Sequence, residues 1–247
     1  MHPSCIVNAE KFVSKYLSPD ATYKVLDVGS FNINGTLKPL FVNGSSVCDV
    51  CGRTFDGPAI CCAGYQSEHR APGVVAGHTR MGEICNGIII RPISKDVRIG
   101  KTWTYIGMDL KESCNSHGDM NSERCRRYNV DLLMDDPHKF PLEDDAVDVV
   151  VSTSCLEHDT LFWLTFDEMV RVVKPGGLLY INVPSNGPYH GFPDDCWRFQ
   201  ADAYKALAQW NKNVHLVENY IDTDVQSHGG WADNVGIFRV QKHRPAK

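Results

Sequence analysis

The amino-acid sequence predicts a single α/β domain in which helices flank a mainly parallel sheet, with an antiparallel edge at the C-terminus. Short apolar runs alternate with segments of helical periodicity, which is typical of strands joined by crossover helices. Residues 146–152 hold an almost unbroken run of valines, typical of a strand buried on both faces. The chain has 247 residues and is 43% apolar, so it can bury a core without disulfides or metal.

Each element follows from periodicity and from its boundary residues. The predicted strands are Lys24–Gly29, Trp103–Met108, Val130–Met134, Ala146–Ser152 and Leu178–Val183, followed by Val214–Tyr220 and Asn234–Val240 at the antiparallel edge. The predicted helices are Ala9–Leu17 capped by Asn8, Thr160–Lys174 capped by Asp159 or Thr160 and ended by Pro175-Gly176-Gly177, and Ala201–Trp210.

Residues 42–101 interrupt this pattern after the first strand and its turn. They are rich in glycine, cysteine and proline and lack clean periodicity, so we expect a Cys-rich insertion within one domain over residues 1–247. Cys48, Cys51, Cys61 and Cys62 begin with the Cys-x-x-Cys spacing of zinc sites. The adjacent Cys61 and Cys62 depart from the paired spacing of zinc ribbons. A structural zinc and plain thiols are therefore both open.

The net charge and the N-terminal sequence limit the classes of partner that we expect. The net charge of −5 and the pI of about 6.0 argue against binding of nucleic acid, because a protein that binds it needs a basic face. No apolar run reaches the roughly 18–20 residues of a membrane helix. The N-terminal residues lack the pattern of a secretory signal, so we expect a cytoplasmic protein whose ten cysteines are thiols or metal ligands. The oligomeric state is not readable from the sequence.

Several motifs stand where strands are predicted to end. The first strand runs through Asp27 into a turn at Gly29, where backbone can approach a ligand closely. Asp109 ends the second strand, where an acid can accept hydrogen bonds from ribose hydroxyls or cap a turn. Asp136 follows the third strand in a segment that also has the composition of a polar turn. The segments Ser152–Asp159 and Val172–Gly177 complete the series.

Taken together, these motifs resemble those of class I S-adenosylmethionine-dependent methyltransferases that act on small molecules. The resemblance covers Tyr23–Leu40 and Lys101–Phe199 and is strongest over Asn129–Asn186. It implies a Rossmann-like sheet, S-adenosylmethionine as cofactor and a small-molecule acceptor. The chain departs from the family's glycine-rich first motif at Phe31 and Ile33. The 82 positions between Asp27 and Asp109 also exceed the roughly 20 expected between these sites.

The resemblance implies a role for each matching residue. Asp27, Gly29 and Ser30 would lie near the methionine part of the cofactor, with Asn34-Gly35 replacing the missing glycine turn. Asp109 would bind the ribose hydroxyls, beside Leu110 at the adenine. Asp136 would face the adenine amine, and Thr153 or Ser154 would give backbone contacts beneath the sulfonium.

The acceptor is expected beside His158, our sequence-based candidate for a general base, because imidazole titrates near neutral pH. Tyr189, His190 and Trp197 are candidates to line the acceptor site, and packing in the core or in a lid is the alternative for the two aromatic residues. Arg198 is predicted to pair either with a substrate carboxylate or with Asp194 or Asp195.

The function that these residues predict best is methyl transfer from S-adenosylmethionine to a small acceptor. An NAD(P)-dependent oxidoreductase also uses a glycine turn and a ribose acid, but the sequence lacks the Gly-x-Gly-x-x-Gly fingerprint. The second alternative is a non-catalytic methyltransferase-like protein that acts through metal or partner binding by its Cys-rich insertion.

Overall fold

The computed structural model describes residues 3–30, 36–42, 97–111, 129–191, 193–223 and 230–242, together with Ser94 and six two-residue strands between 46 and 92. Statements about the structure below refer to these residues.

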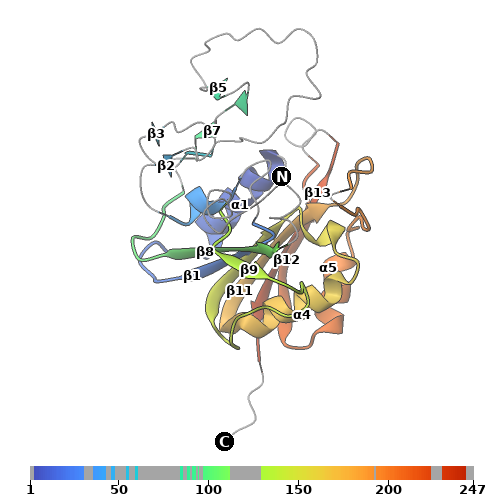
Figure 1. Cartoon of the computed structure of the whole chain (residues 1–247). Helices are drawn as coiled ribbons and strands as arrows, with labels where there is room; N and C mark the ends of the chain where they lie inside the picture. The colour runs from blue at the N-terminus through green and yellow to red at the C-terminus, as the bar shows by residue number, and fades with distance from the viewer. Residues whose placement is uncertain are drawn as a thin grey trace, which may run out of the picture.

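A seven-stranded sheet forms the centre of the molecule (Figure 1). Its strands are β1 (Lys24–Val28), β8 (Thr104–Leu110), β9 (Leu132–Met134), β10 (Val147–Thr153), β11 (Val173–Pro184), β12 (Val214–Ile221) and β13 (Asp233–Val240). They lie in the order β12-β13-β11-β10-β1-β8-β9. The pairs from β11 to β9 are parallel, whereas β13 is antiparallel to both its neighbours. The predicted α/β fold with its antiparallel edge is therefore confirmed.

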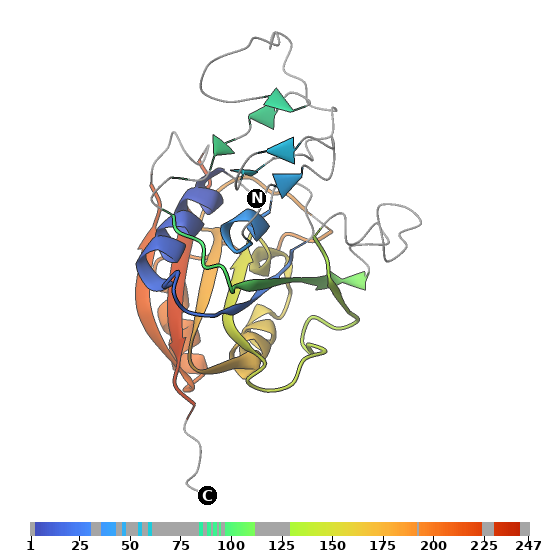
Figure 2. The same ribbon diagram turned by 90° about the vertical axis from the view of Figure 1, so that its left-hand side faces the viewer.

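Helices cover both faces of the sheet (Figures 1 and 2). On one face, α1 (Pro3–Tyr16) and the short 3-10 helix η1 (Lys38–Leu40) pack against a cluster of buried apolar side chains. On the other face, α4 (Phe162–Val172) and α5 (Ala203–Trp210) pack against a second cluster. The valines of β10 alternate between the two, because successive side chains of a strand point to opposite faces. Val149 and Val151 join the α1 side and Val150 the α4 side.

Helix ends differ from the sequence-based expectation. Helix α1 begins at Pro3, so Asn8 is buried inside it, where its amide donates to Asp222. Residue Leu161, and not Asp159 or Thr160, precedes α4, although the Asp159 carboxylate still accepts the Leu161 N–H. Tertiary contacts therefore set these boundaries more than local capping preferences do.

Helix α4 ends at Val172, before the Pro-Gly-Gly segment that was expected to stop it. The reason is strand pairing. Val173 pairs with Val147, and the next pair is Leu178 with Val149. Four residues of β11, 174–177, therefore lie opposite the single Asp148 of β10 at a shift of register, with Gly176 at a φ of 84°.

The segment between β1 and β8 leaves the sheet uninterrupted. Residues Lys24–Val28 pair directly with Thr104–Met108, although some 75 residues separate the two strands. That segment includes the antiparallel pairs β2–β3 (Ser46–Val47, Thr54–Phe55), β4–β7 (Ala59–Ile60, Arg91–Pro92) and β5–β6 (Ile84–Cys85, Ile88–Ile89). They lie beyond the carboxyl ends of the parallel strands in both views (Figures 1 and 2). The long separation between Asp27 and Asp109 thus arises outside the sheet.

The packing of α4 onto the sheet predicts the effect of one core substitution. Phe166 is fully buried, and its ring packs edge-on against Phe238 at 5.1 Å between centroids. We expect Phe166→Ala to lower the free energy of unfolding by about 3–5 kcal/mol through the cavity it leaves. Val217→Ala, at an exposed position of β12, is the control and should change it by less than about 0.5 kcal/mol. Urea denaturation measures both, and equal effects would contradict this account of the core.

Candidate functional site

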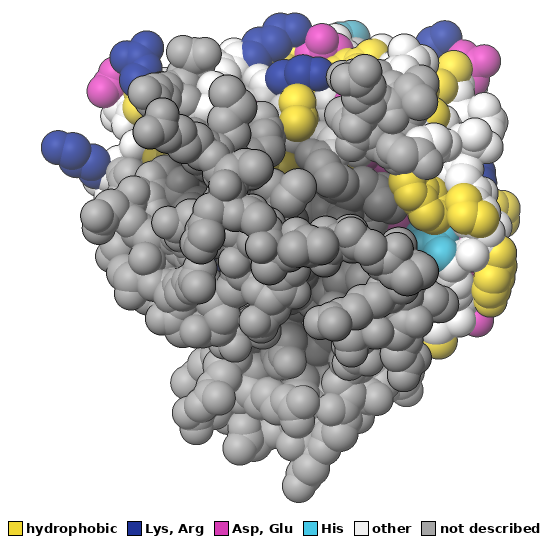
Figure 3. All heavy atoms as spheres, turned by 90° about the horizontal axis from the view of Figure 1, so that it is seen from above, with side chains coloured by type: hydrophobic (Ala, Val, Ile, Leu, Met, Phe, Trp, Pro, Cys, Tyr) yellow, Lys and Arg dark blue, Asp and Glu magenta, His cyan; other side chains and the backbone are white. Residues whose placement is uncertain are grey.

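The candidate site lies where the order of the sheet reverses. From β1 the chain builds outward through β8 and β9 on one side, and from β10 through β11 on the other. Ligands of open α/β sheets bind beyond the carboxyl ends of the strands at such a switch point. Figure 3 looks down on this edge, where a histidine side chain lies at the surface beside hydrophobic side chains.

Gly29 and Cys155 meet at the switch point. The turn after β1 has a φ of 77° at Gly29, a backbone conformation that favours glycine. A Cβ on Gly29 would lie 2.5 Å from the Cys155 Sγ, closer than a real contact. The N–H groups of Gly29 and Ser30 donate to the Met108 carbonyl at 3.0 and 3.1 Å. The first predicted motif is thus fixed tightly between β8 and the segment after β10.

Two buried carboxylates face this edge from neighbouring strands. Asp27 of β1 is 3% exposed and accepts a 2.6 Å hydrogen bond from the Tyr105 hydroxyl, while Asp109 near the end of β8 is also buried. Burial, with a smaller contribution from the charge of Asp109 and against the hydrogen bond from Tyr105, raises the pKa of Asp27 to about 7. The site therefore holds two acids in a dry environment, and the Asp27 carboxyl is partly protonated near neutral pH.

The two aspartates expected to contact the cofactor's ribose and adenine divide between a buried and an exposed position. Asp109 accepts the Leu110 N–H at 2.8 Å with one carboxylate oxygen. Asp136 is exposed, and its carboxylate accepts the His138 N–H at 2.8 Å, which closes a turn. This geometry matches the polar turn that the sequence left open as the alternative for Asp136.

Thr153 ends β10 beside β11, and Ser154 follows it. Thr153 is buried, and the Ser154 N–H donates to the Asn182 carbonyl at 2.9 Å. Ser154 has a φ of 49°, in the left-handed region that non-glycine residues rarely adopt. Such strain is held in place by its surroundings and is frequent at functional sites.

The structure joins two segments that the sequence keeps apart. The 3-10 helix η3 (Leu156–His158) follows β10. The N–H groups of Cys196 and Trp197 both donate to the Glu157 carbonyl, at 2.8 and 3.1 Å. The His158 Nδ1 lies 2.5 Å from the Asp194 carbonyl. Residues 194–197 are therefore bound to η3 by three hydrogen bonds.

Arg198 pairs with Asp195, one of the alternatives predicted for it. Its guanidinium binds both carboxylate oxygens, at 2.5 and 2.7 Å, and also donates to the Pro188 carbonyl at 2.7 Å. This pair holds the pKa of Asp195 well below its usual range. Asp195 in turn accepts the His190 N–H at 2.7 Å. Arg198 thus shapes the segment that carries His190.

Glu157 is the residue that sequence reasoning missed. It is fully buried, and among the described residues no group donates a hydrogen bond to either carboxylate oxygen. Its Oε1 lies 3.6 Å from the His158 Nε2 and 3.8 Å from the His190 Nε2. The Glu157 carboxylate is the chief cause of a raised pKa of His190. The one signal in the sequence is an acid beside the histidine of the Leu-Glu-His motif.

The remaining predicted residues are placed as follows. Tyr189 is 77% exposed. The Trp197 indole donates to the Asp159 carbonyl at 2.8 Å and packs edge-on against Phe162, which fits the packing alternative. The residues that lie outside the described part of the chain are Asn34, Gly35, Cys48, Cys51, Cys61 and Cys62.

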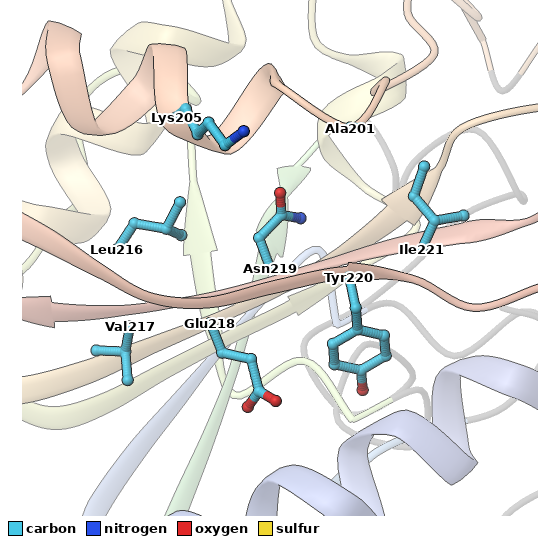
Figure 4. Close-up of a pocket in the computed structure, with 8 residues that line it drawn as sticks. All are labelled: Ala201, Lys205, Leu216, Val217, Glu218, Asn219, Tyr220 and Ile221. Carbon is cyan, nitrogen blue, oxygen red and sulfur yellow. The ribbon is translucent and has the colours of Figure 1, made fainter.

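An open cavity of about 420 Å³ lies elsewhere, at the edge strand β12 (Figure 4). Leu216, Asn219 and Ile221 point toward α5, whereas Glu218 and Tyr220 point to the face of α1. Strands β13, β11 and β10 separate β12 from β1. The cavity is therefore distinct from the candidate site. Among the described residues, no helix has the length and hydrophobicity to cross a membrane.

Comparison with known sequences finds a similarity to methyltransferases over part of the chain. Residues 84–181 match a family described as a methyltransferase domain. An uncharacterized methyltransferase of Mycobacterium leprae is 34% identical over 104 residues, which cover 40% of this chain and 39% of that protein. The demethylmenaquinone methyltransferase of Bacillus cereus is 30% identical over 95 residues, which cover 38% and 40%. The chain thus spans about two-fifths of the length of these relatives.

Comparison with solved structures identifies the fold. A chain of the Haloferax volcanii complex between the Trm112 methyltransferase activator and a methyltransferase aligns over 99% of this chain and 95% of its own, with a TM-score of 0.52 and 14% identity. The Burkholderia thailandensis 1,6-didemethyltoxoflavin-N1-methyltransferase, solved with its substrate and S-adenosylhomocysteine, aligns over 97% and 80%, with a TM-score of 0.51 and 10% identity. Residues 84–181 are therefore similar to a methyltransferase domain, and the fold of the chain is that of these two solved methyltransferase structures.

Proposed function

We propose that this protein transfers a methyl group from S-adenosylmethionine to a small-molecule acceptor. The observation that carries the proposal is the pair of buried carboxylates, Asp27 and Asp109, at the carboxyl ends of adjacent strands beside the tight turn at Gly29. The match to a methyltransferase domain supports the reaction class.

The chemistry of these residues fits the cofactor. The methionine part of S-adenosylmethionine carries an ammonium and a sulfonium, and the charge of Asp109 already raises the pKa of the Asp27 carboxyl. A cationic ligand would relieve this repulsion and favour the ionised form of Asp27. Asp109 is suited to bind the two ribose hydroxyls. Gly29, Ser30, Thr153 and Ser154 would supply backbone contacts.

The acceptor would bind on the side formed by η3 and residues 189–198. When bound, S-adenosylmethionine supplies a methyl group that is electrophilic because it sits on a sulfonium. The protein's own task is to hold the acceptor in line with that methyl group. His158 and His190 face this side, with their rings 4.8 Å apart between centroids. We propose that both contribute to acceptor binding.

The surroundings of His158 favour binding over proton transfer. Its Nδ1 contacts the Asp194 carbonyl at 2.5 Å, and its Nε2 faces the Glu157 carboxylate at 3.6 Å. Both ring nitrogens are directed at protein groups, so neither is positioned to take a proton from an acceptor in this arrangement.

Removal of Asp109 tests the cofactor site. We expect Asp109→Ala to weaken binding of S-adenosylmethionine and S-adenosylhomocysteine about 10- to 100-fold, because charge-assisted hydrogen bonds contribute about 1.5–3 kcal/mol. Isothermal titration calorimetry measures both affinities. Asp202→Ala, an exposed acid just before α5, is the matched control and should bind as the wild type does. Absence of binding by the wild-type protein would refute the proposed cofactor.

The raised pKa of Asp27 predicts how stability varies with pH. A folded-state pKa of about 7 against a model value of 3.8 means that the folded state holds a proton which the unfolded state has lost. The contribution of this proton to the free energy of unfolding is fully present below about pH 4 and is lost as the pH rises to about 7. Asp27→Asn should remove that decline, which amounts to at most about 4 kcal/mol.

Urea denaturation between pH 5 and 8 measures the effect. Asp136→Asn changes an exposed acid at the same edge and should leave the wild-type decline in place. If the free energy of unfolding varies with pH in the same way for Asp27→Asn and the wild type, Asp27 has an ordinary pKa in the folded protein.

A further inference from the structure

We propose that Glu157, His158 and His190 form a binding site for a divalent transition-metal ion. One ligand atom from each residue lies within 4.8 Å of the other two. The Glu157 Oε1 is 3.6 Å from the His158 Nε2 and 3.8 Å from the His190 Nε2. Two ligand atoms bound to one ion at about 2.1 Å and at tetrahedral angles lie about 3.4 Å apart. The observed spacings need only small side-chain shifts.

The hydrogen bond at Nδ1 of His158 orients the ring so that Nε2 faces the Glu157 carboxylate. A carbonyl oxygen only accepts, so the contact with Asp194 places a proton on Nδ1 of His158. In the neutral imidazole, the lone pair of Nε2 then faces the Glu157 carboxylate, which is also an acceptor. Two acceptors directed at each other need a proton or a metal ion between them. Metal-binding histidines characteristically donate their other N–H to a carbonyl or a carboxylate.

His190 approaches the same carboxylate from the other segment. Its Nδ1 lies 3.2 Å from a guanidinium nitrogen of Arg198 and 3.2 Å from a carboxylate oxygen of Asp195, while its Nε2 faces Glu157. With an ion on Nε2, the Nδ1–H would donate to Asp195. Asp195 is held by the two-pronged contact with Arg198. Both histidines thus have an outer partner that orients the ring, and both direct Nε2 at the same carboxylate.

Glu157 gives the independent reason to expect a ligand. Its carboxylate is fully buried and accepts no hydrogen bond from the part of the chain that the structure describes, although a buried charge normally has partners. Its backbone carbonyl accepts the N–H groups of Cys196 and Trp197, which fixes the side chain within the cluster. A bound cation would satisfy the carboxylate without any rearrangement of the backbone.

The donor set indicates the kind of ion. Two imidazoles and one carboxylate suit Zn²⁺, Fe²⁺ or Mn²⁺, and sets of this type leave coordination positions open for water or substrate. The open positions would take an oxygen or nitrogen of the methyl acceptor and lower the pKa of that group. This last step rests on the proposed methyltransferase function, whereas metal binding does not.

Mn²⁺ is the probe of choice because its preference for oxygen ligands limits competition from the ten cysteines. The full chain is stripped with a chelator and titrated with Mn²⁺ without S-adenosylmethionine, and free Mn²⁺ is measured by electron paramagnetic resonance. We expect one ion per chain at these residues. Glu157→Gln and His190→Ala should each weaken binding by at least about 100-fold, since loss of an outer partner alone costs 10- to 100-fold.

His215→Ala, at an exposed histidine of β12, is the matched control and should bind Mn²⁺ within twofold of the wild type. Because Glu157 is buried, the partly exposed His190 provides a second variant that does not depend on core packing. The proposal is overturned if the wild type binds no Mn²⁺, or if both variants bind it as the wild type does. The first result would leave protonated histidines as the partners of Glu157. Calorimetry with S-adenosylmethionine would then still decide the proposed function separately.

Discussion

The close approach of Gly29 to Cys155 is the constraint on which the site depends. Strands β1 and β10 are adjacent, so the segments that leave them compete for the same space. Only a residue without a Cβ allows the turn after β1 to pass Cys155. Cys155 follows the left-handed Ser154 and leads directly into η3. The turn at Gly29 and the segment that carries Glu157 are therefore placed by one contact.

Burial of three acids near this contact lowers the stability of the folded protein, and the rest of the fold must offset that loss. Asp27, Asp109 and Glu157 are buried at one edge of the sheet, where burial disfavours an ionised carboxylate. No packing advantage explains acids at these positions, because β1 and β8 are otherwise apolar where they are buried. The two apolar clusters on opposite faces of the sheet supply the compensating stability. Departures of this kind from good local packing are expected at functional sites.

The sequence allowed the sheet to be predicted better than the helix ends. Strands buried on both faces leave unbroken apolar runs, so the valines of β10 identified it within one residue at each end. The ends of α1 and α4 depend instead on contacts distant in sequence. The pairing of Val173 with Val147 turns the chain into β11 before the Pro-Gly-Gly segment is reached. No local pattern carries that information.

The cluster of Glu157, His158 and His190 also depends on contacts between residues distant in sequence, which no local pattern predicts. Glu157 and His190 are 33 positions apart, a spacing that matches no linear metal motif. They meet because the N–H groups of Cys196 and Trp197 bind the Glu157 carbonyl, and backbone bonds of this kind depend little on side-chain identity. The positions of Asp27 and Asp109 near the ends of β1 and β8 were predictable, because a strand and the turn after it have a recognisable sequence pattern. The two imidazoles come together only when residues 194–197 bind to η3. The edge then divides into a half with buried acids, where we propose that the cofactor binds, and a half with two histidines, where we propose that the acceptor binds.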